Sequence, residues 1–132
     1  MSDFQRFFES LTPISPESWS RFSSLFKPAT LRKGAYFILE DQLATDIAFL
    51  ESGVVRAFYR NTEGVEYNKH FFVNPCFIGA YASLITRLPN KINQQALTDC
   101  TLQVAKYSDI QSLYADCPDI ERANRILAEL FF

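Results

Sequence analysis

The 132-residue sequence contains few of the residues from which metal and redox sites are built. It has one histidine and three cysteines, Cys76, Cys100 and Cys117, which lie far apart and form no Cys-x-x-Cys pair. This pattern argues against a zinc site, a thioredoxin-type motif and a cysteine-ligated iron–sulfur cluster. We therefore expect three reduced thiols, as in most cytosolic proteins, and neither a metal nor another cofactor.

Long apolar runs and an excess of one charge are also missing. No apolar run approaches the roughly 20 residues that cross a membrane, and the amino terminus lacks the basic and apolar regions of a signal peptide. The 13 basic and 15 acidic residues leave a net charge of −2, which does not attract nucleic acid. The sequence predicts a cytoplasmic protein that contacts no membrane and does not bind DNA by itself.

The sequence is rich in bulky apolar residues. It is 48% hydrophobic and 15% aromatic, with 13 Phe and 6 Tyr. A chain of this length and composition is expected to form one globular domain with a thick core, and aromatic residues favour strands. We expect residues 1–132 to be a single domain.

Residues 1–26 are predicted to form two short helices separated at Pro13. Ser15 before Pro16 is typical of a helix start, and Lys27-Pro28 is expected to end the second helix. Apolar residues at helical spacing mark the faces expected to be buried: Phe4, Phe7, Phe8 and Leu11, then Trp19, Phe22, Leu25 and Phe26.

Residues 29–107 consist of short β-branched and aromatic runs separated by turn residues, which is typical of a β-roll or sandwich. Gly64 provides the positive φ that the clearest hairpin loop needs, and residues 80–87 are predicted to form an inserted short helix. Eight strands are predicted: Ala29–Leu31, Tyr36–Leu39, Ile47–Glu51, Val54–Arg60, Val65–Val73, Phe77–Ile78, Gln94–Leu97 and Leu102–Tyr107.

Residues 108–132 are again helical, with Ser108 predicted to cap a short helix and Pro118 to open a longer one. The longer helix has apolar residues at steps of three, four and three: Ile120, Ala123, Leu127 and Leu130. This spacing fits the seam of a homodimeric coiled coil, and it fits an amphipathic helix packed on its own domain equally well. The chain stops at Phe132 with its apolar face still running, so we expect the natural protein to continue.

Four segments in order resemble the cyclic-nucleotide-binding domain. They are Leu31-Arg32-Lys33-Gly34 with Tyr36 and Ile38, the strand–glycine–strand segment 47–56, Asn74-Pro75-Cys76-Phe77-Ile78-Gly79, and Ala96-Leu97-Thr98-Asp99-Cys100-Thr101-Leu102. The resemblance implies a mainly β fold, a double-stranded β-helix or jelly roll with amino-terminal helices and a carboxy-terminal helix. That last helix is similar to the dimer helix of Crp/Fnr transcription regulators, where it leads to a helix-turn-helix domain that nothing in this chain resembles.

The resemblance also implies a ligand cassette. In the family, a glutamate just after Phe-x-Gly binds the ribose hydroxyl, and an arginine near the cassette's end binds the cyclic phosphate. These positions fall here on Ala80 and Asn90, so cyclic AMP is expected to bind weakly or not at all. The candidate pocket residues are Gly79, Ala80, Tyr81, Ser83, Arg87, Asn90, Lys91 and Asn93. Either the pocket is reshaped for another small or anionic ligand, or it is vestigial.

Two other residues, His70 and Cys76, are of types that can carry chemistry. Strict alternation along the strand places His70 on a polar face with Glu66 and Asn68, so we do not expect it to be catalytic or to ligate haem. Cys76 has no basic neighbour in the sequence, and its thiol is expected to be unactivated.

The leading hypothesis is the regulatory domain of a Crp/Fnr-like transcription regulator. A possible small-molecule effector would act through a homodimer helix on DNA-binding domains outside this chain. A free-standing binding or scaffold module of the same fold is the alternative. A cupin-like enzyme is disfavoured because one histidine cannot supply a cupin metal site, so we expect no enzymatic activity.

Overall fold

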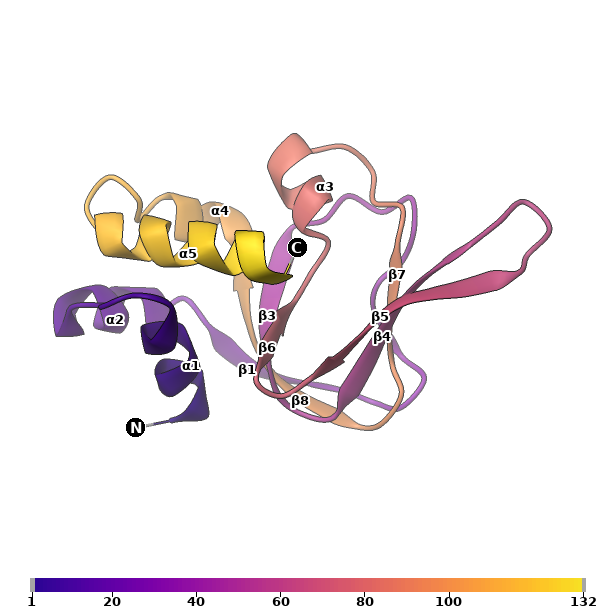
Figure 1. The fold of residues 1–132 in the computed structure, drawn as a ribbon, viewed down its shortest axis with the longest axis horizontal. Coiled ribbons are helices and arrows are strands. Elements are labelled where there is room, and N and C mark those ends of the chain that lie inside the picture. Colours follow the sequence, from indigo (N-terminus) through magenta and orange to yellow (C-terminus); the bar gives the residue numbers. More distant parts are fainter. Residues whose placement is uncertain (1, 132) are drawn as a thin grey trace.

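A computed structural model describes residues 2–131, apart from the side chain of Phe131. Its strands form two four-stranded antiparallel sheets, in the orders β1-β8-β3-β6 and β2-β7-β4-β5 (Figure 1). Their bounds are β1 (Lys27–Leu31), β2 (Tyr36–Ile38), β3 (Asp46–Ser52), β4 (Val54–Arg60), β5 (Glu66–Val73), β6 (Cys76–Ile78), β7 (Asn93–Ala96) and β8 (Cys100–Lys106). The predicted β-roll of eight strands is confirmed.

Strands β4 and β5 form a hairpin that projects away from the helices (Figure 1). Its loop is held by the Asn61 side chain, whose Oδ1 accepts hydrogen bonds from the backbone N–H groups of Glu63 and Val65, both at 2.9 Å. Gly64 has a φ of +83°, as the loop prediction required. Along the strands, Ala57 pairs with His70 while Phe58 pairs with Asn68. Lys69 is therefore an extra residue, a β-bulge.

Two helices, α1 (Asp3–Leu11) and α2 (Pro16–Ser23), precede the roll. Ser15 caps α2 as predicted, with its Oγ accepting a hydrogen bond from the N–H of Ser18 at 3.1 Å. The predicted end of α2 is wrong, because the helix stops at Ser23 and Lys27-Pro28 already belong to β1. Antiparallel pairing of β1 with β8 requires extended backbone from Lys27 onward.

Three further helices complete the fold: α3 (Tyr81–Thr86), α4 (Tyr107–Gln111) and α5 (Pro118–Phe131). The predicted helix within 80–87 and the start at Pro118 are confirmed. Ser108 does not cap α4, since this helix begins one residue earlier and its N-cap position is Lys106. The reason is tertiary: the Tyr107 N–H is already bonded to the Thr45 carbonyl at 2.9 Å. Among residues 2–131, no helix is long and apolar enough to cross a membrane.

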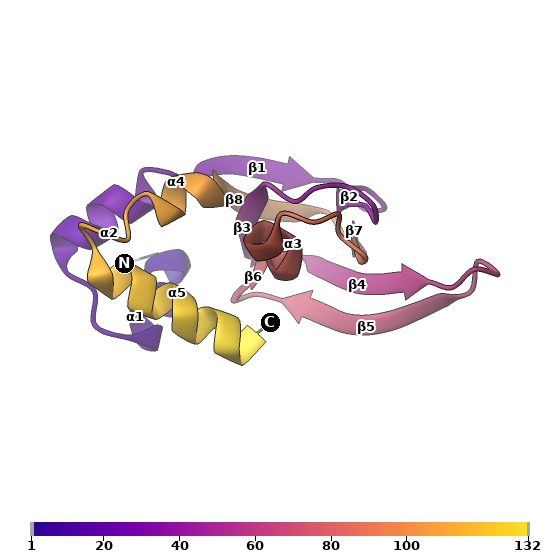
Figure 2. The ribbon, with the colours of Figure 1, turned by 90° about the horizontal axis from the view of Figure 1, so that it is seen from above.

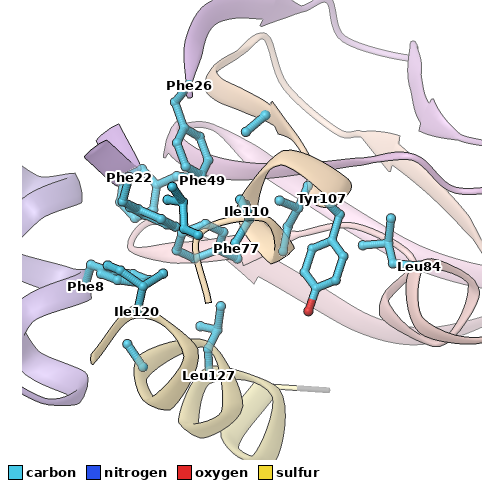
Figure 3. Packing of buried hydrophobic residues seen from close by; sticks show 14 of the residues in the cluster. Phe8, Phe22, Phe26, Phe49, Phe77, Leu84, Tyr107, Ile110, Ile120 and Leu127 are labelled. Atoms are coloured by element: carbon cyan, nitrogen blue, oxygen red, sulfur yellow. The ribbon is translucent and has the colours of Figure 1, made fainter. Parts of the chain in front are cut away.

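The helices enclose an aromatic core against one sheet (Figure 3). Rings from α1, α2, β3 and β6 meet there, with centroids 4.2 Å apart for Phe8 and Phe22 and 5.6 Å apart for Phe49 and Phe77. Helix α5 runs alongside α1 and α2 and closes this core (Figure 2). The carboxylate of Asp119, near the start of α5, accepts hydrogen bonds from the Ser15 N–H at 3.0 Å and the Ser18 hydroxyl at 2.8 Å. These bonds join α5 to the start of α2.

Candidate functional site

A pocket of about 280 Å³ opens between the inner face of the β4-β5-β7 sheet and the segment that leads into α3. Its described lining residues are Ala57, Lys69, His70, Phe72, Gly79, Ala80, Tyr81, Ala82, Asn90, Ile92 and Gln94. The wall is mostly apolar, with a few polar groups, which is the usual composition of a small-molecule site.

Four of the eight predicted cassette residues line this pocket: Gly79, Ala80, Tyr81 and Asn90. Gly79 has a φ of +148°, and a Cβ at this position would stand 3.3 Å from the carbonyl oxygen of Asp46. Glycine is therefore favoured where the chain turns from β6 toward the pocket wall. Ala80 follows as the N-cap of α3 and offers only a half-buried methyl group.

The other four predicted residues do not line it. Buried Ser83 is structural, because its Oγ accepts from the Ala44 N–H at 3.0 Å and donates to the Leu88 carbonyl at 2.5 Å. Buried Asn93 accepts from the Glu40 N–H at 2.9 Å. The remaining two, Arg87 and Lys91, are exposed on the connection after α3.

Asn90 lines the pocket, but its side chain holds the loop. Its Nδ2 donates to the carbonyls of Leu39, at 3.2 Å, and Ile92, and its Oδ1 accepts from the Ile92 N–H at 3.1 Å. The residue is 6% exposed. The amide therefore already has partners at both ends.

Sequence reasoning missed Lys69 and His70, and placed His70 on the wrong face. The Lys69 bulge interrupts the alternation, so His70 shares the pocket face with Ala57 and Phe72. The His70 and Phe72 rings meet edge-on with centroids 4.6 Å apart. Asn68 instead lies on the opposite face, where its Oδ1 accepts from Arg56. One extra residue is enough to reverse a period-two prediction.

Gln94 was also missed, because it lies on a strand and outside the cassette. Its partner across the sheet is Ala57, and both side chains face the interior of the roll. The Gln94 Nε2 donates to the Gly79 carbonyl at 3.0 Å, which links the two sheets behind the pocket. Its Oε1 is buried and has no hydrogen-bond partner among the described residues.

A chain of tyrosines leads from the pocket to α5. Burial and a hydrogen bond with Tyr107 raise the pKa of Tyr81 above its ordinary value. The Tyr107 hydroxyl in turn accepts from Asn124 Nδ2 at 2.9 Å and lies 3.3 Å from the Tyr114 hydroxyl. Figure 3 shows Tyr107 at the edge of the aromatic core, with its hydroxyl directed away from Ile110. Asn124 is 3% exposed, so the network is buried where it reaches α5.

Solved structures share the fold of this chain, although no protein-family model and no curated protein matches the sequence. A cyclic nucleotide-binding domain from Methylobacillus flagellatus aligns with a TM-score of 0.79 and 13% identity, over 95% of this chain and 75% of that one. The Thermus thermophilus catabolite activator protein aligns with a TM-score of 0.76 and 19% identity, over 87% of this chain. The c-di-GMP responsive global regulator CLP of Xanthomonas campestris gives 0.74 and 17%, over 88%.

The chain has the fold of a cyclic-nucleotide-binding domain. It spans about half of the two regulators, 54% of the activator and 57% of CLP. At these identities the likeness establishes the fold, and the resemblance of the four sequence segments is confirmed at that level.

The apolar stripe on α5 of this domain lies mainly inside the chain. Ile120, Ala123 and Leu127 are at most 1% exposed and belong to the aromatic core, whereas Leu130 is 65% exposed. Figure 3 shows Ile120 and Leu127 on the inner face of the helix. Three of the four expected seam residues therefore pack within the domain. Of the two interpretations that their spacing allowed, these three residues follow that of an amphipathic helix packed on its own domain. Phe132, at the end of the stripe, lies outside the described residues.

The three cysteines of the domain are free and buried. Burial raises the pKa of the Cys76 thiol from 9.0 to about 12, which leaves it almost entirely protonated at neutral pH. Within residues 2–131, no group of histidine, cysteine and acidic residues could hold a metal ion.

Proposed function

We propose that this chain is the ligand-sensing regulatory domain of a Crp/Fnr-type transcription regulator, whose pocket does not bind cyclic nucleotides tightly. The observation that carries the proposal is the pocket wall at Ala80 and Asn90. Ala80 presents a methyl group where the resemblance implies a carboxylate for the ribose hydroxyl. The Asn90 amide is uncharged and bonded to the loop where the resemblance implies an arginine for the phosphate.

The energetic consequence is large. Losing a charge-assisted contact to a buried ligand costs on the order of 2–5 kcal/mol. Two such losses reduce affinity by roughly three decades or more. We therefore expect cyclic AMP and cyclic GMP to bind weakly or not at all.

Calorimetric titration with each nucleotide tests this part of the proposal. The unmodified chain should give no binding heat at micromolar concentrations, and Ala80→Glu should improve binding by restoring one acceptor. Ala82→Glu is the matched control, because Ala82 lines the same pocket two residues further along the chain, and it should not improve binding. Asn90→Arg is expected to loosen the loop, because arginine cannot accept from the Ile92 N–H. Submicromolar binding by the unmodified chain would refute the proposal.

Regulation needs a link between the pocket and α5, and the buried tyrosines supply a candidate. Tyr81 lines the pocket and bonds Tyr107, whose hydroxyl accepts from Asn124 on α5. A ligand that moves Tyr81 would change the partners of a buried amide in that helix. Two sites that bias one such element are coupled in free energy.

The link can be tested without knowing the ligand. Removing one hydroxyl by Tyr81→Phe should shift the NMR signals of the Asn124 side-chain amide. Tyr67→Phe, which removes the same group from an exposed tyrosine on the hairpin, should leave those signals in place. Equal responses to the two substitutions would contradict the link.

In this proposal the protein acts in the cytoplasm as a homodimer and contacts DNA only through a domain outside the chain. The net charge of −2 gives little release of counterions from DNA, so a low-salt gel-shift assay of the chain should be negative. Binding with micromolar affinity would contradict this division of labour. Dimerisation along α5 would use the exposed Leu130, and Leu130→Glu should weaken it in sedimentation experiments.

A further inference from the structure

Strand β5, with eight residues the longest of the roll, has one unpaired side. It lies at the end of the sheet β2-β7-β4-β5, and Figure 2 shows it at the margin of the roll with β4 on its inner side. Among residues 2–131, its backbone pairs with β4 alone. The backbone N–H and C=O groups of such a free edge can pair with a strand of another chain.

The composition of β5 favours pairing with an identical strand. Tyr67, Phe71 and Val73 are 43%, 52% and 56% exposed, and residues of these types favour strands. The strand contains neither proline nor glycine, and its charged residues Glu66 and Lys69 cancel. Exposed segments with high strand propensity and low net charge associate with copies of themselves. The partner that this edge fits is therefore a second copy of the chain.

The other edge strands are protected by their length. Strands β1, β2 and β6 have five, three and three residues. Very short edges form too few hydrogen bonds to hold a strand of another chain. At eight residues, β5 lacks this protection.

The bulge at Lys69 divides the long edge. Asn68 and His70 pair with consecutive residues of β4, so Lys69 between them has no partner there. The bulge leaves a run of three residues, Glu66–Asn68, and a run of four, His70–Val73. These runs are as short as the other edges. A bulge also bends and twists its strand, so a straight second strand cannot follow both runs.

The charge of Lys69 acts in the same direction. Its side chain is exposed on the free edge strand. A full-length antiparallel pair of two β5 strands is centred between Lys69 and His70, so the two lysines would occupy adjacent pairs. Like charges at such close cross-strand positions destabilise the pairing.

We propose that Lys69 and its bulge prevent two copies of this chain from associating through the free edge of β5. The inference goes beyond the proposed function, which concerns the pocket and α5. Without the bulge, the edge would be a continuous strand able to extend the sheet of one copy into that of another.

Deleting Lys69 tests the proposal, because Asn68 and His70 then become consecutive and keep their partners on β4. Sedimentation velocity compares this variant with its parent, and both carry Leu130→Glu so that any contact along α5 is weakened alike. We expect the dissociation constant for self-association to fall about tenfold or more, the effect of one or two added hydrogen bonds. Deletion of Thr62, which lies unpaired in the loop of the same hairpin, is the matched control and should change nothing.

Three substitutions locate the effect. Val73→Lys, added to the deletion, places a charge on the same edge and should return association to the level of the parent. Lys69→Val removes the charge and keeps the bulge, so it should strengthen association, though less than the deletion does. Lys69→Arg keeps both and should behave as the parent.

The outcomes that overturn the proposal are distinct. One is equal sedimentation of the parent and the deletion variant when both give dispersed amide spectra. Another is association of the deletion variant that persists with Val73→Lys, since the contact then lies elsewhere. If the deletion variant does not fold, Lys69→Val and Lys69→Arg decide the question, and equal association of these two overturns the proposal.

Discussion

Leu127→Ala tests whether the stripe on α5 stabilises the single chain. Leu127 is 1% exposed and lies in the aromatic core, so truncation removes buried atoms and leaves a cavity. Such substitutions reduce the free energy of unfolding by about 2–5 kcal/mol. Domains of this size are stable by about 5–15 kcal/mol, so the loss is a large fraction of the total.

Leu130→Ala is the matched control, because it is the same substitution one turn later on the same helix. Leu130 is 65% exposed, and its truncation should change the free energy of unfolding by about 0.5 kcal/mol or less. Urea unfolding followed by circular dichroism and Trp19 fluorescence measures both variants. With a slope of about 1–3 kcal/mol per molar urea, a loss of about 3 kcal/mol lowers the midpoint by about 1–3 M.

Sedimentation velocity on the same samples separates stability from assembly. If Leu127→Ala keeps the midpoint of the unmodified chain but dissociates a dimer, Leu127 forms a seam between copies and the packing described above is wrong. A dimer must be allowed for by repeating the unfolding at several protein concentrations, since the midpoint of a coupled dimer depends on concentration.

Three further outcomes are expected. Gly53→Ala should destabilise the chain by more than about 2 kcal/mol, because φ is +101° and the new Cβ would stand 2.6 Å from the Asp99 carbonyl oxygen. Gly64→Ala is the control: its φ is +83° but no atom lies within 4 Å of its Cβ, so it should cost only about 1–2 kcal/mol of strain. Equal urea midpoints for the two variants would contradict this prediction. Cys76 should react with iodoacetamide at pH 8 about a thousand times more slowly than an unperturbed thiol, because burial raises its pKa from 9.0 to about 12. Labelling of Cys76 in the folded chain at the rate seen in the urea-unfolded chain would disprove this prediction. Burial alone would raise the pKa of Asp119, but hydrogen bonds from Ser15, Ser18 and Ile120 lower this pKa on balance. The carboxylate therefore contributes stability above the unfolded pKa of about 3.9, and this contribution is lost as the pH falls through the folded pKa. Asp119→Ala should reduce the free energy of unfolding more at pH 7 than at pH 3, and equal reductions would contradict this.

Local signals in the sequence predicted the elements well. Strand β4 has the predicted bounds, Val54–Arg60, because alternation and the Gly64 turn are local properties of the chain. The start of α2 follows from Ser15 and Pro16 in the same way. The end of α2 and the start of α4 were missed because distant residues decide them. Lys27 pairs with Val104, and the Tyr107 N–H bonds the Thr45 carbonyl.

The residues of the candidate site were also predicted only in part. The family resemblance placed Gly79, Ala80, Tyr81 and Asn90 in the cassette, and all four line the pocket, the first three directly after β6 and Asn90 beyond α3. Lys69, His70 and Gln94 reach the pocket from other strands. A bulge and a cross-sheet bond place them there, and neither leaves a signal in the linear pattern.

The apolar stripe of α5 shows most clearly what each level decided. The spacing of Ile120, Ala123 and Leu127 by itself determined that a helix forms there with one apolar face. The spacing could not determine what covers that face, because packing against a second copy and packing against the chain's own core both require the same apolar residues at these positions. Only the tertiary structure decided this: α1, α2 and the β3-β6 edge of one sheet bring the phenylalanine rings to that face and exclude water from it.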